Sequence, residues 1–375
     1  MTEQENKIEL KEGMCYFNAA VQIGESLYYS AKYMNGLFRA DLATGKSEYI
    51  TMFDTEREED IHKLAFSEGN KIWFIPSYIG EKIAIFHIDS CTMEYVEIPD
   101  PKKVCDGFLF MEYVRKEDVV WLVPGVYGAF LRVNVKTGEL RRIKLPIEEY
   151  EKVNFPVIQG CERDDKIYLC PWDDAGIFYL DLKSEEVKTI DIETKQNFYR
   201  NIFIFDNCIY LFPRVIPNDI LKMDLGTKKC ENIGLHITKE KTPIVAIHYE
   251  RNTNRMFLFP QLEEEKIFIL DLESQKASEI EMPIDSGLKI SEGAFWRDMT
   301  YISEDTFYVM SNDKMAPILE YRDNVLKPFL LEGPKELLVR KLVDLVARKE
   351  KENEKMKHQG NIGEKIYKAI FSDNP

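Results

Sequence analysis

The chain has 375 residues and a mass of 44.0 kDa, enough for two or three ordinary domains or for one long array of repeats. Hydrophobic residues make up 45% and charged residues 31%, a balance that excludes disordered, collagen-like and membrane-spanning chains. The formal net charge of −15 argues against a broad nucleic-acid-binding surface, so no nucleic-acid partner is expected.

The first residues, MTEQENKIELKEG, lack the basic and apolar regions of a secretory signal. No apolar run approaches the roughly 18 residues that a transmembrane helix needs, so no membrane partner is expected. The cysteines are odd in number, scattered and without a CxxC pair: Cys15, Cys91, Cys105, Cys161, Cys170, Cys208 and Cys230. We therefore expect reduced thiols and a cytoplasmic protein.

An aromatic-rich strand that ends in proline recurs along the chain. The copies are KIWFIP (71–76), VVWLVP (119–124), KIYLCP (166–171), CIYLFP (208–213) and RMFLFP (255–260), with weaker copies near 26–31 and 306–311. The five prolines are spaced 48, 47, 42 and 47 residues apart. A repeat of about 40–50 residues made of short strands is typical of β-propeller blades.

Each aromatic strand stands second among four. An apolar run precedes it, such as HKLAFSEG (62–69), and two more strands follow around a tight turn, as in GLFRADLATG (36–45) and SEYITMF (47–53). The pattern predicts an all-β, seven-bladed β-propeller with four-stranded antiparallel blades over residues 1–333. In the fourth unit we expect a first strand in FPVIQG (155–160) and a loop over CERDD (161–165). Either residues 7–10 or residues 325–331 would supply an outer strand that closes the ring.

The chain thus resembles the β-propeller superfamily, and its hairpins resemble those of PQQ-like propellers. The segment from Asp41 to Gly45, DLATG, matches the D-x-x-T-G part of that family's hairpin, and residues 134–138, NVKTG, are a partial second copy. Tyr49 stands where the family has tryptophan, and that tryptophan is absent from every unit. A quinone is therefore not implied, and no cofactor is expected. WD40 and Kelch signatures match less well, and fold resemblance does not by itself give function.

From Pro334 the hydrophobic period becomes helical, with Leu338, Leu342, Leu345 and Val346 on one side. Residues 334–375 are therefore predicted to form a helical C-terminal extension. Residues 335–375 hold 10 Lys and Arg against 7 Asp and Glu, a net charge of +3, and the rest of the chain holds 40 against 58, a net charge of −18. The extension would dock on the propeller, bind a partner, or mediate self-association.

Loop lengths indicate which face of the ring carries function. The turns between strands one and two and between strands three and four are short, whereas the loops on the opposite face are longer and varied. Aromatic and charged residues gather in the sequence at this longer-looped face, which we call the mouth. The candidate ligand-binding residues there are Tyr33, Tyr78, Tyr127, Trp172, Asp173, Asp174, Arg200, Arg214, Trp296 and Arg297. Aromatic faces with a few charges suit a protein, peptide or glycan ligand.

Two functions remain open. The first is a non-catalytic recognition protein that binds a protein, peptide or glycan at the mouth and uses the C-terminal helices as a second docking element. The second is an enzyme acting on a glycan or small molecule at the axial mouth, with Asp173 and Asp174 as an acid–base pair beside Arg200 and Arg214. No catalytic residue is assigned, because hydrolase and metalloprotease motifs are absent. The five histidines have no ligand spacing, so no metal site is expected.

Overall fold

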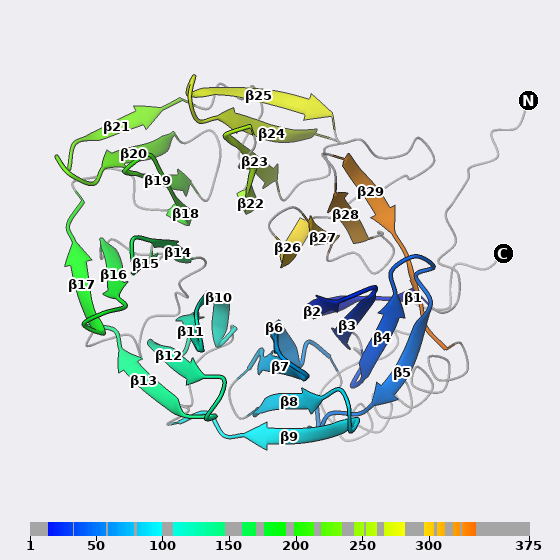
Figure 1. The fold of residues 1–375 in the computed structure, drawn as a ribbon. Coiled ribbons are helices and arrows are strands. Elements are labelled where there is room, and N and C mark those ends of the chain that lie inside the picture. The colour runs from blue at the N-terminus through cyan, green and yellow to red at the C-terminus, as the bar shows by residue number, and fades with distance from the viewer. Residues whose placement is uncertain are drawn as a thin grey trace, which may run out of the picture.

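The computed structural model describes residues 14–334, with gaps at 33, 58, 79–80, 100–107, 147–159, 170–175, 193–198, 214–218, 235–243, 251–252, 261–265, 282–295, 304–305, 312–317 and 323–324. Seven four-stranded antiparallel sheets surround a central axis (Figure 1), and an eighth sheet has two strands. The predicted seven-bladed β-propeller is therefore confirmed. Residues 335–375 of the predicted helical extension lie outside the described residues. Among those described, no helix has the length and apolar character needed to cross a membrane.

Each blade is built from four strands that are consecutive in the chain, ordered from the axis outward. The innermost strands are β2 (Phe17–Ile23), β6 (His62–Glu68), β10 (Phe110–Lys116), β14 (Gly160–Arg163), β18 (Tyr199–Phe205), β22 (Ile244–Glu250) and β26 (Trp296–Ser303). The second strands are β3 (Ser26–Ala31), β7 (Lys71–Pro76), β11 (Val119–Pro124), β15 (Lys166–Leu169), β19 (Cys208–Pro213), β23 (Arg255–Pro260) and β27 (Thr306–Ser311).

The two outer positions complete the blades. The third strands are β4 (Leu37–Asp41), β8 (Ile83–His87), β12 (Ala129–Asn134), β16 (Ile177–Asp181), β20 (Ile220–Asp224), β24 (Lys266–Asp271) and β28 (Ile318–Arg322). The outer strands are β5 (Ser47–Thr51), β9 (Thr92–Val96), β13 (Leu140–Lys144), β17 (Glu186–Ile190), β21 (Cys230–Ile233), β25 (Lys276–Glu281) and β29 (Val325–Phe329).

The core lies between neighbouring blades. In β7, Trp73 and Phe74 point to opposite faces of the sheet, and both side chains are buried. Phe17 of the first blade packs edge-on against Tyr308 of the seventh, with ring centroids 5.4 Å apart. Each buried side chain of this size contributes about 2 kcal/mol to folding. The aromatic second strands are apolar on both faces because each sheet is covered by a neighbour on both sides.

The hairpins between third and fourth strands share one turn chemistry. Asp41 Oδ1 accepts hydrogen bonds from the backbone N–H and the hydroxyl of Thr44, both at 2.8 Å. The same arrangement recurs at Asp224 with Thr227 and at Asp271 with Ser274. These bonds lower the pKa of all three carboxyl groups. The D-x-x-T-G hairpin at Asp41 and its D-x-x-T and D-x-x-S counterparts at Asp224 and Asp271 are therefore side-chain-capped turns.

The fourth blade corrects one sequence-based prediction. Its first strand is β14, so Cys161 to Arg163 belong to the strand and not to the loop that was expected over CERDD. The turn is only Asp164 and Asp165, both with positive φ, 50° and 57°. Aspartate tolerates this left-handed backbone, and two such residues give the tight turn that suits a twisted hairpin.

The ring closes without a blade shared between the two ends of the chain. Residues 325–329 form the outer strand of the seventh blade, as one of the two predicted alternatives required, and residues 7–10 lie outside the described part of the chain. Strand β30 (Leu331–Glu332) then pairs antiparallel with β1 (Met14–Cys15). Glu332 also forms a parallel bridge to Lys46 and donates its N–H to the Gly45 carbonyl at 2.9 Å. We call this junction of β1, β30 and the first blade the clasp.

Candidate functional site

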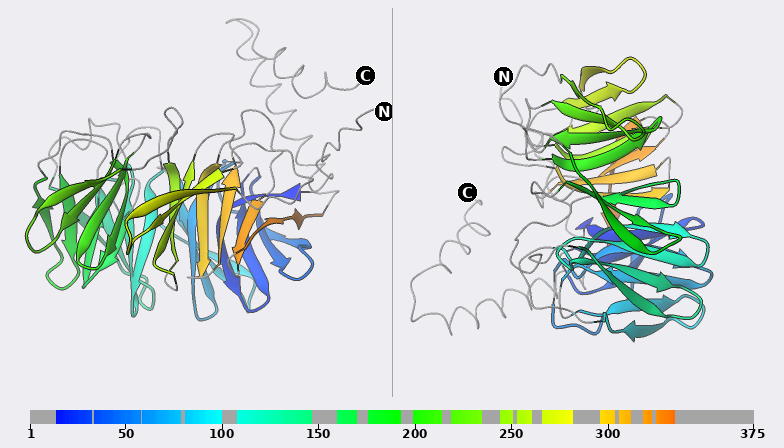
Figure 2. Two further views of the ribbon diagram at one scale, coloured as in Figure 1. Left: turned by 90° about the horizontal axis from the view of Figure 1, so that it is seen from above. Right: turned by 90° about the vertical axis from the view of Figure 1, so that its left-hand side faces the viewer.

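At the mouth the innermost strands begin and the second strands end, and Figure 2 shows the blades edge-on with their strands running between the two faces. Six innermost strands carry a register irregularity one residue after they start. The residues that the register skips there are Asn18, Lys63, Met111, Arg200, Val245 and Arg297.

Four of these six bulges lie beside a proline of the repeat, and the other two follow pairs with Ala31 and Ser311. In four blades the first residue of the innermost strand lies opposite the terminal proline of the second strand: Pro76, Pro124, Pro213 and Pro260. Proline has no N–H to donate, so regular pairing stops there and a bulge is tolerated. Because a bulge re-aims side chains, the six bulges mark backbone positions around the mouth. Three of the six residues at these positions are cationic, and none is acidic.

Four described residues form an alternating row of cations and aromatic rings at the mouth. The Arg57 guanidinium lies over the Tyr78 ring, 4.1 Å from its centroid. The Tyr78 ring is 5.8 Å from that of Phe108, and the Lys63 ammonium lies 4.7 Å from the Phe108 centroid on the other side. We call these residues the mouth array. Arg57 is exposed, both rings are half-buried and Lys63 is buried, so the array runs from solvent into the ring.

Backbone hydrogen bonds hold the array in place. The Ser77 N–H donates to the Ile61 carbonyl and the Leu109 N–H donates to the Ser77 carbonyl, both at 2.8 Å. Ser77 precedes Tyr78 and Leu109 follows Phe108, so these bonds tie both aromatic residues to the second blade. An ion pair also orients Arg57, because Oε1 of Glu81 lies 3.5 Å from Nε of Arg57. The array is thus fixed by contacts between segments from the first three blades.

A polar network secures the loop that carries Arg57. Asn35 donates to the Phe53 and Thr55 carbonyls and accepts from the Phe53 N–H, all within 3.2 Å. The Asn18 amide donates to the Asp60 carboxylate. These contacts satisfy the backbone of a loop that crosses between two blades, which positions Arg57 above Tyr78.

His62 is buried at the start of β6 and is 3% exposed. Its Nδ1 lies 2.9 Å from the Ser30 hydroxyl, and the Phe53 ring packs against it at 4.3 Å. Burial lowers its pKa to about 3, so the imidazole is neutral in the folded protein at ordinary pH. It joins the first two blades and is not placed for chemistry at the surface.

Glu112 is the described acidic group with the most unusual setting. The residue follows the bulge of β10, and its half-buried carboxyl group faces Gly160 of the fourth blade. Its Oε2 accepts the Gly160 N–H at 3.1 Å. Burial raises the pKa of this carboxyl to about 7, and burial with the nearby Glu112 charge raises the pKa of Cys161 to about 12. Glu112 can therefore take up or release a proton near neutrality.

Of the predicted ligand-binding residues, only Tyr78 and Tyr127 have described side chains. Tyr78 belongs to the mouth array. Tyr127 is 5% exposed, donates its hydroxyl to the Pro99 carbonyl and packs on Phe110 with ring centroids 5.0 Å apart. Tyr33, Trp172, Asp173, Asp174 and Arg214 lie outside the described residues, and Arg200, Trp296 and Arg297 are described only in their backbone, in β18 and β26. Their roles stay predictions.

The sequence did not single out Arg57, Lys63, Phe108 or Glu112. Arg57 and Phe108 come from loops between blades, where no periodicity applies. Lys63 could have been found, because it follows His62 at the start of an innermost strand, the position that also suggested Arg200 and Arg297. Within the described residues no group of three or more His, Cys, Asp or Glu side chains converges as a metal site would.

Comparison with known proteins gives structural similarity only. No family model matches the chain, and no curated protein matches its sequence. A virginiamycin B lyase from Staphylococcus aureus, in an inactive variant with quinupristin, has a TM-score of 0.58 at 12% identity, over 84% of this chain and 96% of that one. YCF48 bound to the D1 peptide has a TM-score of 0.58 at 8% identity, over 84% of this chain and 93% of that one. A chain of the mitotic checkpoint complex has a TM-score of 0.56 at 8% identity, over 86% of this chain and 94% of that one.

These similarities establish the fold alone. They agree with the β-propeller fold that the repeat predicted. The same fold serves proteins in peptide and protein assemblies and also a lyase, so it leaves both predicted functions open. The choice between them depends on the residues at the mouth.

Proposed function

We propose that this propeller is a non-catalytic recognition protein that binds a protein partner through an acidic, extended segment at the mouth. The mouth array carries the proposal. Two half-buried aromatic rings beside an exposed arginine form the kind of surface that dominates protein interfaces, where Tyr, Phe and Arg are enriched. YCF48, which shares the fold, is known in complex with a peptide, and this supports a peptide ligand here.

The charge of the site selects the ligand class. The ring as a whole is acidic, yet the bulged positions at the mouth carry Lys63, Arg200 and Arg297. Cationic groups that face the mouth of an acidic protein attract anionic ligands, whereas the acidic remainder of the surface repels them. Arginine binds carboxylates with two parallel hydrogen bonds, and the tyrosine and phenylalanine rings accept apolar or proline side chains.

We further propose that the protein acts in the cytoplasm. The described cysteines Cys15, Cys91, Cys161, Cys208 and Cys230 are all free thiols. Free cysteines that include exposed ones suit a reducing compartment.

A second candidate function is an enzyme that acts at the axial mouth, and one observation favours it. Glu112 has a pKa near neutrality and lies at the wall of the ring one residue beyond a bulge, which are properties of a general acid or base. In this candidate it would join Asp173, Asp174, Arg200 and Arg214, whose side chains lie outside the described structure.

Binding of short labelled peptides with graded Asp and Glu content tests the proposal. We expect acidic peptides to bind, salt to weaken binding, and Tyr78→Ala to weaken it about tenfold or more. Tyr179→Ala is the matched control, because Lys166 lies 5.3 Å above the Tyr179 ring in a similar pair, where β15 starts away from the mouth. The proposal would be refuted if both substitutions reduced peptide affinity equally, or if affinity did not depend on peptide charge. A peptide or glycan that returns with an altered mass would establish the enzyme instead.

A further inference from the structure

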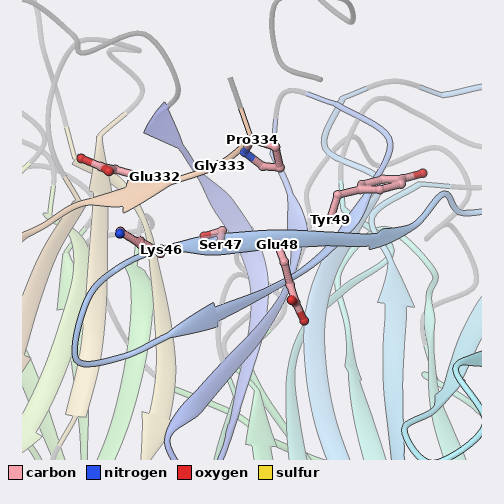
Figure 3. Close-up of a pocket in the computed structure, with 7 residues that line it drawn as sticks. All are labelled: Lys46, Ser47, Glu48, Tyr49, Glu332, Gly333 and Pro334. Atoms are coloured by element: carbon pink, nitrogen blue, oxygen red, sulfur yellow. The ribbon is translucent and has the colours of Figure 1, made fainter. Parts of the chain in front are cut away.

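A groove opens beside the clasp, at the outer rim of the first blade. Its lining is Lys46, Ser47, Glu48, Tyr49, Glu332, Gly333 and Pro334, and it encloses about 530 Å³. Figure 3 shows Tyr49 and Pro334 on the same side of β5, with Glu48 pointing to the other side. We call it the rim groove. It is separate from the mouth array, and an inference about it does not depend on the proposed function.

Apolar surface is left uncovered on both chain segments that form the rim groove. Met52 directly follows β5 and is 45% exposed, and Leu330 directly precedes β30 and is 44% exposed. They are the large hydrophobic side chains found exposed among the described residues. Neither residue lines the rim groove itself, but each lies a few residues along the chain from its lining, so exposed apolar surface continues from the groove along both segments.

The edge of the first blade is also open at this point. Strand β5 is the outermost strand, and the bridge between Lys46 and Glu332 covers only the residue just before it. Along Ser47–Thr51, no described strand pairs with the outward side of β5. Unpaired sheet edges invite association, and proteins commonly cover them with a helix or a loop.

The chain itself supplies an occupant at this place. Pro334 lines the rim groove, so the next residue begins at its wall. Residues 335–346 carry Leu338, Leu342, Leu345 and Val346 on one side at helical spacing. A segment tethered at the groove has a high effective concentration there, so modest contacts suffice to hold it. Residues 335–375 carry a net charge of +3 and the ring a net charge of −18, which adds long-range attraction.

We propose that residues 335–346 dock in the rim groove of their own chain, with their leucine side covering Met52, Leu330 and the open edge of β5. The segment is then a third component of ring closure, after the antiparallel pair of the clasp and the bridge to Lys46. In this arrangement residues 335–346 would not be available to bind another protein. Residues beyond 346 would remain for other contacts.

Methionine oxidation in the full-length protein tests this docking. With dilute peroxide and peptide mass spectrometry, Met52 should oxidise nearly as slowly as Met256, which is fully buried. The double variant Leu338→Gln with Leu342→Gln should oxidise at Met52 about tenfold faster, because the segment is released. The control Arg340→Gln with Ala347→Gln changes the opposite side of the same predicted helix and should leave the rate unchanged.

Two results would overturn the proposal. One is rapid oxidation of Met52 in the unaltered chain, at the rate of a free methionine. The other is protection of Met52 that rises with protein concentration alongside dimers in light scattering, since that assigns the groove to a second copy of the chain.

Discussion

Gly45→Ala is expected to destabilise the ring by about 3 kcal/mol, a large effect for the addition of one methyl group. Gly45 has a positive φ of 70°, in which an L-residue is strained by about 1–2 kcal/mol. A Cβ at this position would lie 2.3 Å from the Leu330 carbonyl oxygen, so the backbone that leads into β30 must move away. That movement stretches the hydrogen bond from the Glu332 N–H to the Gly45 carbonyl and the pairing of β30 with β1, which adds about 1–2 kcal/mol.

Gly138→Ala is the matched control for this substitution. Gly138 occupies the same hairpin position in the third blade, with φ of 75°, and no atom lies within 4 Å of a Cβ built there. Only the backbone strain applies, so the expected loss is about 1 kcal/mol. Urea denaturation of both variants and the wild type measures the difference. Equal losses would show that the clasp contributes nothing to the stability of the closed ring.

The repeat allowed much of this fold to be predicted from sequence. Strands that are apolar on both faces and end in proline arise only where a sheet is covered on both sides and its ladder stops, and five copies at a near-constant spacing specify a ring. The clasp was not predictable in the same way. Strands β1 and β30 have two residues each, too few for any periodicity, and their pairing depends on the geometry of the closed ring.

The mouth was predicted in outline but not in its contacts. Tyr78 follows a proline-ended strand, and that position is readable from the repeat. Arg57 and Phe108 come from loops of irregular length, and they meet Tyr78 because backbone bonds at Ser77 and Leu109 draw neighbouring blades together. Glu112 looks like an ordinary strand residue in sequence. Its raised pKa arises from desolvation where the third blade packs against the fourth, which only the three-dimensional packing reveals.

Two buried groups give the folded ring opposite responses to pH, and His62 is the first. Burial lowers its pKa from the usual 6.5 to about 3. Between these values the unfolded chain binds a proton that the folded ring does not, so the free energy of unfolding falls as pH decreases. The slope is about 1.4 kcal/mol per pH unit.

Glu112 acts in the other direction. Burial raises its pKa from the usual 4.5 to about 7, so between these values the folded ring holds a proton that the unfolded chain has released. The contribution of Glu112 to the free energy of unfolding is therefore fully present below pH 4.5 and is lost as pH rises through 7. Its slope is also about 1.4 kcal/mol per pH unit, with the opposite sign.

Between pH 4.5 and 6.5 the two slopes cancel, and removal of either group should expose the other. Glu112→Gln keeps an amide oxygen that can accept the Gly160 N–H but cannot titrate, so its free energy of unfolding should rise relative to wild type by about 2.5 kcal/mol from pH 4.5 to 6.5. His62→Gln should fall relative to wild type by a similar amount over the same range. Urea denaturation at several pH values measures both, and the comparison of slopes removes any constant cost of the substitutions. If Glu112→Gln runs parallel to wild type across this window, the carboxyl is not desolvated where the third blade packs against the fourth.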